Sequence, residues 1–328
     1  MRQRRNAAAA LLAAALLAFA AAPTVAQPAA AWPERTVTLT VCFPPGGSTD
    51  VAARLLAPPL SEALGRPVVV ENRPGAGGNI GIGAVARSQP DGHTLLVCSS
   101  AFVVNPSLYA RVPYDPERDF APISTLGASP NVFAVRAASP FRSLSEVLAA
   151  ARARPDGLNY ASSGVGTTPH LAGEVLKLRA GVSIQHIVFA GAGPATQAAL
   201  AGTVEMLVAH QGSIEPMLRS GQLRPLAVTA AARTADMPEV PTVAELGFAG
   251  TESDTFLGLW APAGTPAPVL ARLSDAVVSA LRRPEMAERF RGAGIPVSAD
   301  GPDGLRARVA REVPLWRDVI RQAKVAAE

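Results

Sequence analysis

The sequence contains few cysteine, lysine and aromatic residues, and these shortages exclude some classes of protein. Its 328 residues include two cysteines, too few for a disulfide-stapled scaffold. Aromatic residues make up 5% of the chain, and no cluster of basic residues is interleaved with them. Because the basic residues are nearly all dispersed arginines, a nucleic-acid-binding protein is not indicated, despite a pI of about 9.6.

The two cysteines, Cys42 and Cys98, each stand at the end of an apolar, strand-like run. In an oxidising compartment they could form a disulfide. They could equally be two small buried hydrophobic residues, because a bridge needs Cα atoms within about 7 Å and the sequence does not give that distance. Both interpretations are open at this point.

The first residues have the pattern of a secretory signal peptide. Three arginines within residues 1–6 precede an uninterrupted run of Ala, Leu and Phe over residues 7–22. The run is too short to stay in a membrane, and the small residues Thr24, Val25 and Ala26 predict cleavage after Ala26. Without residues 1–26 the formal net charge falls from +4 to about +1. A soluble protein exported to the periplasm is expected.

The remaining roughly 300 residues are enough for two domains of ordinary size. Short β-branched runs alternate with helical patterns, which is typical of α/β proteins with parallel sheets. The expected strands are 37–41, 68–70, 94–97, 159–161, 184–189, 204–208 and 226–229. Helices are expected over 170–180, from about Pro268, and along the apolar stripe 305–320, where Pro314 should kink or divide the helix.

Domain boundaries are expected near Ser129-Pro130 and within 251–254. They would divide the chain into a signal peptide over 1–26, a lobe 1 formed by 27–130 together with 254–328, and a lobe 2 formed by 131–253. Two segments then cross between the lobes, and they would act as a hinge.

A glycine turn follows the first expected strand and leads into a helix. Backbone N–H groups and the positive end of the helix dipole favour an anion at such a place. The alternative is a tight turn that needs glycine only for its backbone conformation. The candidate ligand-binding residues here are Pro45, Gly46, Gly47, Ser48 and Asp50.

A second turn of this kind lies in the expected lobe 2, after the strand 159–161. Ligands bind beyond the carboxyl ends of parallel strands, so two such loops facing each other would grip opposite ends of one ligand. His170 could instead be a helix-start residue that bonds only to backbone. The candidates in this loop are Ser163, Gly164, Gly166, Thr167 and His170.

Three further candidates come from other loops that follow strands. Asn79 belongs to the glycine-rich segment 73–81, which is expected to form a wall of the cleft. Ser99 follows the strand 94–97, and Gly191 lies in a fourth glycine loop that ends at Pro194, a plausible first helical position.

No arrangement that would carry out catalysis stands out. The serines show no G-x-S-x-G elbow, and the four histidines are scattered with no H-E-x-x-H pair. Residues 81–86 match a dinucleotide fingerprint only formally, because the strand ends well before Gly81 and no acid lies about 20 residues on. Catalysis, a cofactor and a metal are therefore not expected.

Short motifs are spread along essentially the whole mature chain. They are 43–50 (FPPGGSTD), 71–79 (ENRPGAGGN), 90–92 (PDG), 163–167 (SGVGT), Gly202, Arg233, 241–247 (PTVAELG) and 261–266 (APAGTP). Together, and in this order, these motifs resemble the Bug family, the binding proteins of tripartite tricarboxylate transporters. Two residues depart from the pattern: Cys42 stands where the family usually has Pro, and Ala198 where it often has an acid.

The resemblance implies a type II periplasmic-binding-protein fold, with two α/β lobes that close over a carboxylate, an amino acid or an aromatic acid. It also implies integral membrane transporter subunits as partners. A monomer is expected. Three alternatives stay open: a receptor that signals to a membrane sensor, a secreted enzyme such as a hydrolase or isomerase, and a structural envelope protein that binds no ligand.

Overall fold

The computed structural model describes residues 32–189, 191–249 and 251–326, so the expected signal peptide at 1–26 lies outside the described residues. The helices and strands belong to one compact unit, Arg35–Glu328. The strands are β1 Val37–Val41, β2 Val68–Asn72, β3 Thr94–Ser99, β4 Phe120–Arg136, β5 Asn159–Ser162, β6 Gln185–Val188, β7 Met206–His210, β8 Leu223–Val228 and β9 Asp254–Pro262. The helices are α2 Ser48–Leu64, the 3-10 turn η1 Ala76–Gly78, α3 Asn79–Ala86, α4 Ala101–Leu108, α5 Leu144–Ala153, α6 Thr168–Ala180, α7 Ala192–Ala201, α8 Gln211–Arg219, α9 Ala267–Leu281, α10 Pro284–Gly292 and α11 Gly301–Ala323.

The strands form one long sheet in the order β2-β1-β3-β9-β4-β7-β5-β6, with β8 paired to β4. Pairing is parallel within β1, β2 and β3 and within β5, β6 and β7, as the alternating pattern predicts. It is antiparallel wherever β4, β8 or β9 takes part. The protein therefore has the α/β class expected from the sequence, with a mixed sheet.

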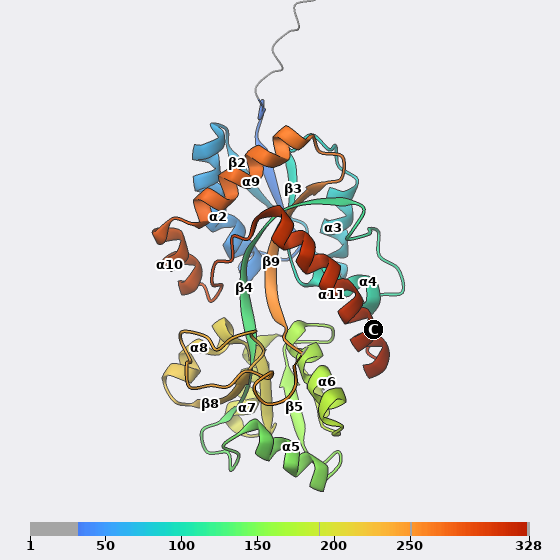
Figure 1. Ribbon diagram of the computed structural model, residues 1–328, viewed down its shortest axis with the longest axis vertical. Helices are drawn as coiled ribbons and strands as arrows, with labels where there is room; N and C mark the ends of the chain where they lie inside the picture. The colour runs from blue at the N-terminus through green and yellow to red at the C-terminus, as the bar shows by residue number, and fades with distance from the viewer. Residues whose placement is uncertain (1–31, 190, 250, 327–328) are drawn as a thin grey trace, which may run out of the picture. The chain divides into compact units, whose positions relative to one another are not determined.

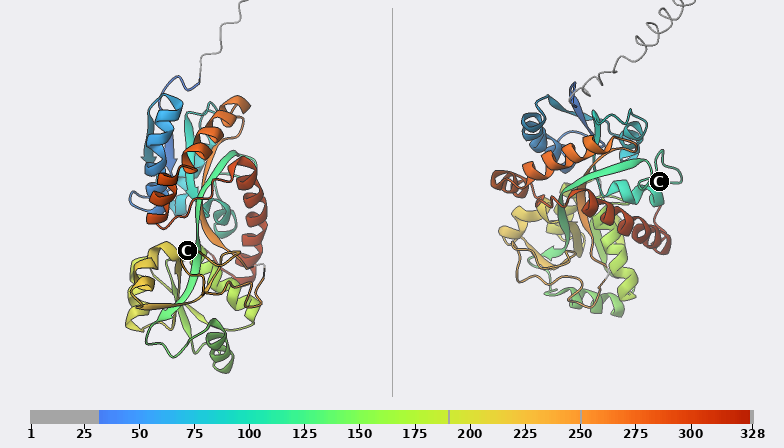
Figure 2. Two further views of the ribbon diagram at one scale, coloured as in Figure 1. Left: turned by 60° about the vertical axis from the view of Figure 1, so that its left-hand side comes forward. Right: turned by 45° about the horizontal axis from the view of Figure 1, so that its top comes forward.

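Strand β4 belongs to both halves of the sheet (Figure 1). Its first part pairs with β9 beside β3, and its last part pairs with β7 and β8. We call the elements around β1, β2, β3 and β9 lobe 1, and those around β5, β6, β7 and β8 lobe 2. Helices flank the strands of each lobe, as the two further views show (Figure 2).

The backbone at the junction of the lobes is tied together by hydrogen bonds. The Thr229 amide donates to the Asn131 carbonyl at 2.9 Å, and the Asn131 amide donates to the Thr229 hydroxyl at 2.9 Å. The Ser253 amide donates to the Thr229 carbonyl at 3.0 Å. Residues from both crossing segments thus meet at one place, and the boundaries near 130 and 251–254 stay predictions.

Each lobe has an apolar core, and one cluster includes residues of both lobes. Lobe 1 packs Phe102 against Trp260, with ring centroids 4.3 Å apart. The same cluster contains Leu171 and Val175 of α6 in lobe 2, beside the buried face of α11. Helix α11 of lobe 1 therefore holds α6 of lobe 2 through apolar contact.

Of the two outcomes expected at Pro314, a kink or a division, the division of the last helix is not observed. Helix α11 is one element across Pro314, from Gly301 to Ala323. Its stripe of Leu305, Val309, Val313, Trp316 and Ile320 is buried. A proline inside a helix costs about 3 kcal/mol, and burial of five large apolar side chains, at about 1.5 to 3 kcal/mol each, exceeds that cost.

Candidate functional site

A cavity of about 580 Å³ lies between the two lobes. Lobe 1 contributes the turn before α2 and the residues after α10, and lobe 2 contributes the N-terminal residues of α7 and α8. The lining residues are Gly46, Gly47, Ser48, Val51, Ser129, Ser163, Ala192, His210, Gly212, Ser213, Thr255, Leu257, Ala293, Gly294 and Ile295.

A smaller cavity of about 170 Å³ also takes residues from both lobes, and it shares His210 and Thr255 with the larger one. The start of α4 in lobe 1 and the start of α6 in lobe 2 lie along it. Its lining includes Phe43, Gly77, Ser99, Ser100, Ala101, Leu108, Val165, Gly166, Thr167 and Thr168. We call the two cavities together the cleft.

The cleft has helix N-termini but no charged lining residue among the described residues. The first turns of α2, α7 and α8 contribute to the larger cavity, and those of α4 and α6 to the smaller one. The first amides of a helix have no partner within the helix, and the helix dipole places positive potential there. The cleft therefore favours a small anion held by amides and hydroxyls.

The turn before α2 is fixed by a carboxylate that faces the protein. The Gly46 amide donates to Asp50 Oδ2 at 2.9 Å, and so does Arg54 Nε at 2.9 Å. Asn72 Nδ2 donates to Asp50 Oδ1 at 2.9 Å. Burial by itself would raise the pKa of Asp50, but the hydrogen bonds from Arg54, Gly46 and Asn72 outweigh it and lower this pKa to about 2. Asp50 is thus an ionised brace for the turn.

The brace changes the expected role of this loop. Because the Gly46 amide is bonded to Asp50, the amides left to meet an anion are those that follow it. Helix α2 has Gly47 as its N-cap, with no side-chain cap on its first amides. Gly47 and Ser48 therefore offer the better position for a ligand.

The lobe 2 loop before α6 is braced in a similar way. The Gly166 amide donates to His170 Nδ1 at 3.0 Å. Thr167 caps α6 by accepting from the His170 amide, and its hydroxyl donates to the Gly164 carbonyl at 2.8 Å. His170 itself is buried and does not line the cleft. The alternative considered for His170, a helix-start residue bonded to backbone, describes its observed contacts.

Behind this loop lies a stack of three rings. The His170 ring lies 4.0 Å from that of His186, which lies 4.8 Å from that of Tyr160. Burial, with a smaller effect from Lys177, lowers the pKa of His170 to about 4. Burial, followed by the charge of His170, lowers the pKa of His186 to about 4. Both rings are neutral at pH 7, and they bond to the two ends of the loop: His170 to the Gly166 amide and His186 to the Ser162 hydroxyl.

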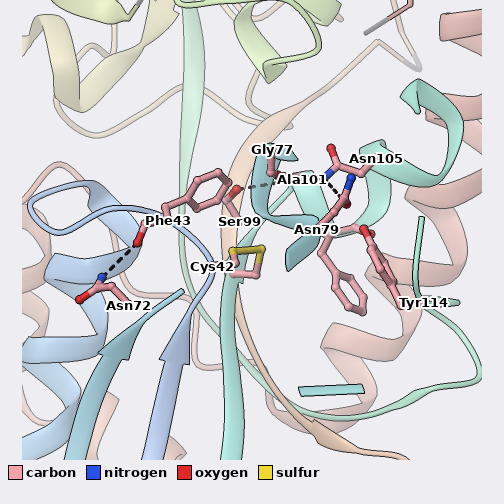
Figure 3. The surroundings of a disulfide bond; sticks show 11 residues. Cys42, Phe43, Asn72, Gly77, Asn79, Ser99, Ala101, Asn105 and Tyr114 are labelled. Atoms are coloured by element: carbon pink, nitrogen blue, oxygen red, sulfur yellow. Dashed lines mark hydrogen bonds between the residues drawn. A yellow bond between two sulfur atoms is a disulfide. The ribbon is translucent and has the colours of Figure 1, made fainter. Parts of the chain in front are cut away.

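The two cysteines form a disulfide under the lobe 1 loops (Figure 3). Their Cα atoms are 5.7 Å apart, since Cys42 and Cys98 follow the register pair Val41 and Val97 of β1 and β3. Both cysteines are fully buried. The residues that follow them, Phe43 and Ser99, line the smaller cavity, so the disulfide fixes the base of two cleft loops.

Asn79 supports the cleft indirectly. Its Oδ1 accepts from Asn105 Nδ2 at 2.8 Å, and the same Nδ2 donates to the Gly77 carbonyl at 2.9 Å (Figure 3). Gly77 lines the smaller cavity, whereas Asn79 is buried and does not. The glycine-rich segment expected as a cleft wall thus contributes Gly77.

The structure brings seven of the sequence-predicted site residues to the cleft. The six others, which do not line it, lie beside or behind its loops. Those in the lining are Gly46, Gly47, Ser48, Ser99, Ser163, Gly166 and Thr167. Those outside it are Pro45, Asp50, Asn79, Gly164, His170 and Gly191. Their roles toward a ligand stay predictions.

The sequence did not point to Thr255 and His210, which line both cavities of the cleft. Thr255 Oγ1 makes a short hydrogen bond with Thr168 Oγ1 across the lobes, and lies 3.4 Å from His210 Nε2. Burial lowers the pKa of His210 to about 4, which keeps it neutral at pH 7. His210 could have been found, because it ends a strand and is followed by Gly212 and Ser213, the same strand, glycine and serine pattern as the predicted loops. Thr255 carries no such signal.

Two α/β lobes around a cleft built from helix N-termini define a solute-binding protein. The chain belongs to the tripartite tricarboxylate transporter family receptors, whose family model matches residues 52–324. This family is one of binding proteins and not of enzymes. In the described residues no group of three His, Cys, Asp or Glu could hold a metal ion.

Similar proteins of known sequence cover nearly the whole chain. The UPF0065 protein in the tcbD-tcbE intergenic region of Pseudomonas sp. strain P51 is 39% identical over 305 residues, 93% of this chain and 91% of that protein. Protein BugT of Bordetella pertussis is 37% identical over 302 residues, 91% of this chain and 93% of its own. The resemblance to the Bug family is confirmed.

Solved structures of similar proteins have the same fold. R. palustris Rpa4515 with adipate is 34% identical, with a TM-score of 0.77 over 90% of this chain and 99% of that chain. MatC (Rpa3494) from Rhodopseudomonas palustris with bound malate is 34% identical, with a TM-score of 0.74 over 88% of this chain and all of that chain. The periplasmic binding protein BugD is 34% identical, with a TM-score of 0.74 over 90% of this chain and all of its own. These three structures confirm the expected periplasmic-binding-protein fold.

Proposed function

We propose that this protein captures a small dicarboxylate between its lobes and presents it to the membrane subunits of a tripartite tricarboxylate-type transporter. The observation that carries the proposal is the cleft, in which first-turn residues of five helices line two adjoining cavities without a charged side chain among the described residues. Two groups of helix N-termini, one at each cavity, match an acid with a carboxylate at each end.

The ligands of similar proteins support this assignment. One solved relative holds adipate and another holds malate, and both of these are dicarboxylates. The combined cleft, at about 580 and 170 Å³, is in the range of ordinary small-molecule sites, about 300 to 1,000 Å³. A neutral site of amides and hydroxyls selects for charge on the ligand, because each carboxylate can accept several charge-assisted hydrogen bonds.

The proposed role includes export to the periplasm and work as a monomer. The arginine-rich start and the apolar run over residues 7–22 support export. None of the helices in the described residues is both long and apolar enough to span a membrane. A binding protein that meets its transporter in the periplasm fits these features.

The proposal is tested by thermal shift against a panel of small mono-, di- and tricarboxylates, followed by calorimetry on the acids that bind. Each binding acid is compared with its methyl esters. Loss of one carboxylate charge is expected to weaken binding at least about tenfold, because a charge-assisted hydrogen bond contributes about 1.5 to 3 kcal/mol. Equal affinity for acid and ester, or no acid that binds, would refute it.

A further inference from the structure

The side chain of His210 lines both cavities of the cleft and can carry a charge. Among the described lining residues, Tyr109 of the smaller cavity is the other side chain that can titrate, and no Asp, Glu, Lys or Arg is present. Because the two cavities share His210 and Thr255, a ligand that spans both of them passes beside this ring.

The contacts of His210 leave one ring nitrogen for a ligand. The residue ends β7 and is paired across the sheet with Asn131 of β4. Its Nε2 lies 3.4 Å from the Thr255 hydroxyl, whereas its Nδ1 makes no hydrogen bond with any described residue and is not enclosed by protein. Since His210 is partly exposed and borders both cavities, an acid bound in the cleft can reach Nδ1.

In the free protein this ring is neutral at pH 7. Burial lowers the pKa of His210 to about 4. The residue is also the N-cap of α8, where the positive end of the helix dipole disfavours a cation. A neutral imidazole has one N–H donor, whereas an imidazolium donates from both nitrogens and carries a positive charge. A carboxylate therefore gains more from the protonated ring.

The charged groups on the elements around His210 are bonded to partners of their own. Helix α7 and residues 129–134 of β4 carry no ionisable side chain, and His170 of α6 is neutral. Arg291 of α10 is exposed and lines a separate small cavity. The carboxylates accept as follows: Asp254 of β9 from Arg308, Glu215 of α8 from Arg219, Asp236 from Gln211, Glu174 of α6 from Lys177 and from Tyr160 of β5, and Asp50 of α2 from Arg54. A bound anion is the charge that would stabilise an imidazolium at His210.

We propose that His210 takes up a proton when a carboxylate binds beside it, so that the cleft gains a cation only in the presence of its ligand. The proton comes from the solvent and binds to the ring nitrogen that lacked one, while the carboxylate stays ionised. The inference rests on the proposed function, and it adds to that function a specificity-determining residue and a dependence of affinity on pH.

Proton uptake makes binding tighter at lower pH. An opposite charge within about 4 to 6 Å shifts a pKa by about 1 to 3 pH units, so a carboxylate at the ring should raise the pKa of His210 from about 4 to about 6. At pH 7 the ring is then neutral with or without ligand. Between pH 7 and pH 5 the proton should strengthen binding about tenfold, and below about pH 4 the gain should level off.

Calorimetry with adipate and malate, in two buffers that differ in ionisation enthalpy, measures the protons taken up by the mature protein on binding. The comparison is with His210→Gln, which keeps a hydrogen-bonding side chain but cannot titrate. At pH 5 wild type should take up most of one proton more than this variant, and its advantage in Kd over the variant should grow about tenfold from pH 7 to pH 5. Protonation of the ligand itself affects both proteins equally, so the difference belongs to the ring.

His186→Gln is the matched control, because the pKa of His186 is also lowered to about 4 but its ring lines neither cavity. This variant should take up protons as wild type does. Proton NMR of the ring signals of wild type, assigned with the two variants, gives the pKa of His210 with and without ligand. This measurement does not depend on the stability of a variant.

Equal proton uptake in wild type and His210→Gln would overturn the inference and leave the proposed function in place. A pKa of His210 that the bound acid does not raise would have the same meaning. If wild type binds neither these acids nor any other carboxylate, the proposed function fails, and the inference fails with it.

Discussion

Gly212 of lobe 2 and Gly294 of lobe 1 are in backbone contact, and we predict that this contact limits how far the cleft closes over a ligand. A Cβ atom on Gly212 would lie 2.5 Å from Gly294 Cα and 2.6 Å from the Gly294 carbonyl oxygen. These are backbone atoms, so no side-chain rotation can relieve the clash. Ordinary carbon contacts are about 3.5 to 4.0 Å, so Gly212→Ala should hold this edge of the cleft open by about 1 Å.

The cost of that methyl group falls on ligand binding. Overpacking a close contact costs about 1 to 3 kcal/mol, which corresponds to a roughly 5- to 160-fold rise in Kd. The free protein can avoid the clash if its lobes are apart. Because Gly212 lies in the first turn of α8, alanine should favour the helix and leave the melting temperature of the free protein equal or higher.

Calorimetry gives the change in Kd, and small-angle scattering shows whether ligand still lowers the radius of gyration. Gly292→Ala is the matched control, because a Cβ atom there meets nothing within 4 Å although it lies two residues from Gly294. Wild-type affinity in Gly212→Ala, or a clear fall in the stability of the free variant, would refute this account of the contact.

Three further predictions concern the cleft loops and stability. Gly47→Val should raise Kd at least about tenfold in calorimetry, because the valine side chain would cover the first amides of α2. The variant should still fold, since a Cβ atom there meets only the Pro44 carbonyl oxygen, at 3.8 Å. An unchanged Kd would exclude this loop from the ligand site. His170, His186 and His210 have pKa values lowered from 6.5 to about 4, so they bind fewer protons in the folded than in the unfolded protein. The free energy of unfolding should therefore fall as the pH drops from about 6.5 to about 4, with no further loss from these groups below about pH 4. Urea titrations that give the same free energy of unfolding across this range would contradict the assignment. Replacing Cys42 and Cys98 by serine should cost about 4 kcal/mol in the chain-entropy view, as the disulfide joins residues 56 apart, and an unchanged urea midpoint would show that it adds no stability.

The local parts of this fold could be predicted from the sequence because their signals are local. A β-branched run, a glycine turn and a helical face predict β1, the turn at Gly46 and α2 without knowledge of the rest of the chain. The helix expected over 170–180 is observed as Thr168–Ala180, with its glycine C-cap at Gly181.

The crossing strands could not be predicted in this way. Strand β4 contains Pro122, Gly127 and Pro130, and its register with β9 shifts twice, so its sequence has no regular alternation. Such a strand is stabilised by its partners and its burial, which are properties of the folded protein. Ser129 lies in β4 and Thr255 in β9, so their place in the cleft could not be predicted for the same reason.

The sequence indicated which residues lie near the cleft better than it indicated what their side chains contact. Asp50 and His170 have the residue types of ligand contacts, yet each fixes the loop amide four residues before it. A sequence shows that a polar residue stands beside a glycine turn, but not whether its side chain faces the ligand or the protein.

The path of the chain has a consequence for the order in which the molecule can assemble. Lobe 2 is one continuous segment, whereas lobe 1 needs β9 between β3 and β4. Its core also needs the apolar face of α11, Gly301–Ala323, which follows lobe 2 in the sequence. Lobe 1 therefore cannot complete its core until α11 has been synthesised. Under the proposed export to the periplasm this delay would be an advantage, because the N-terminal strands could not form a finished lobe before the chain crosses the membrane.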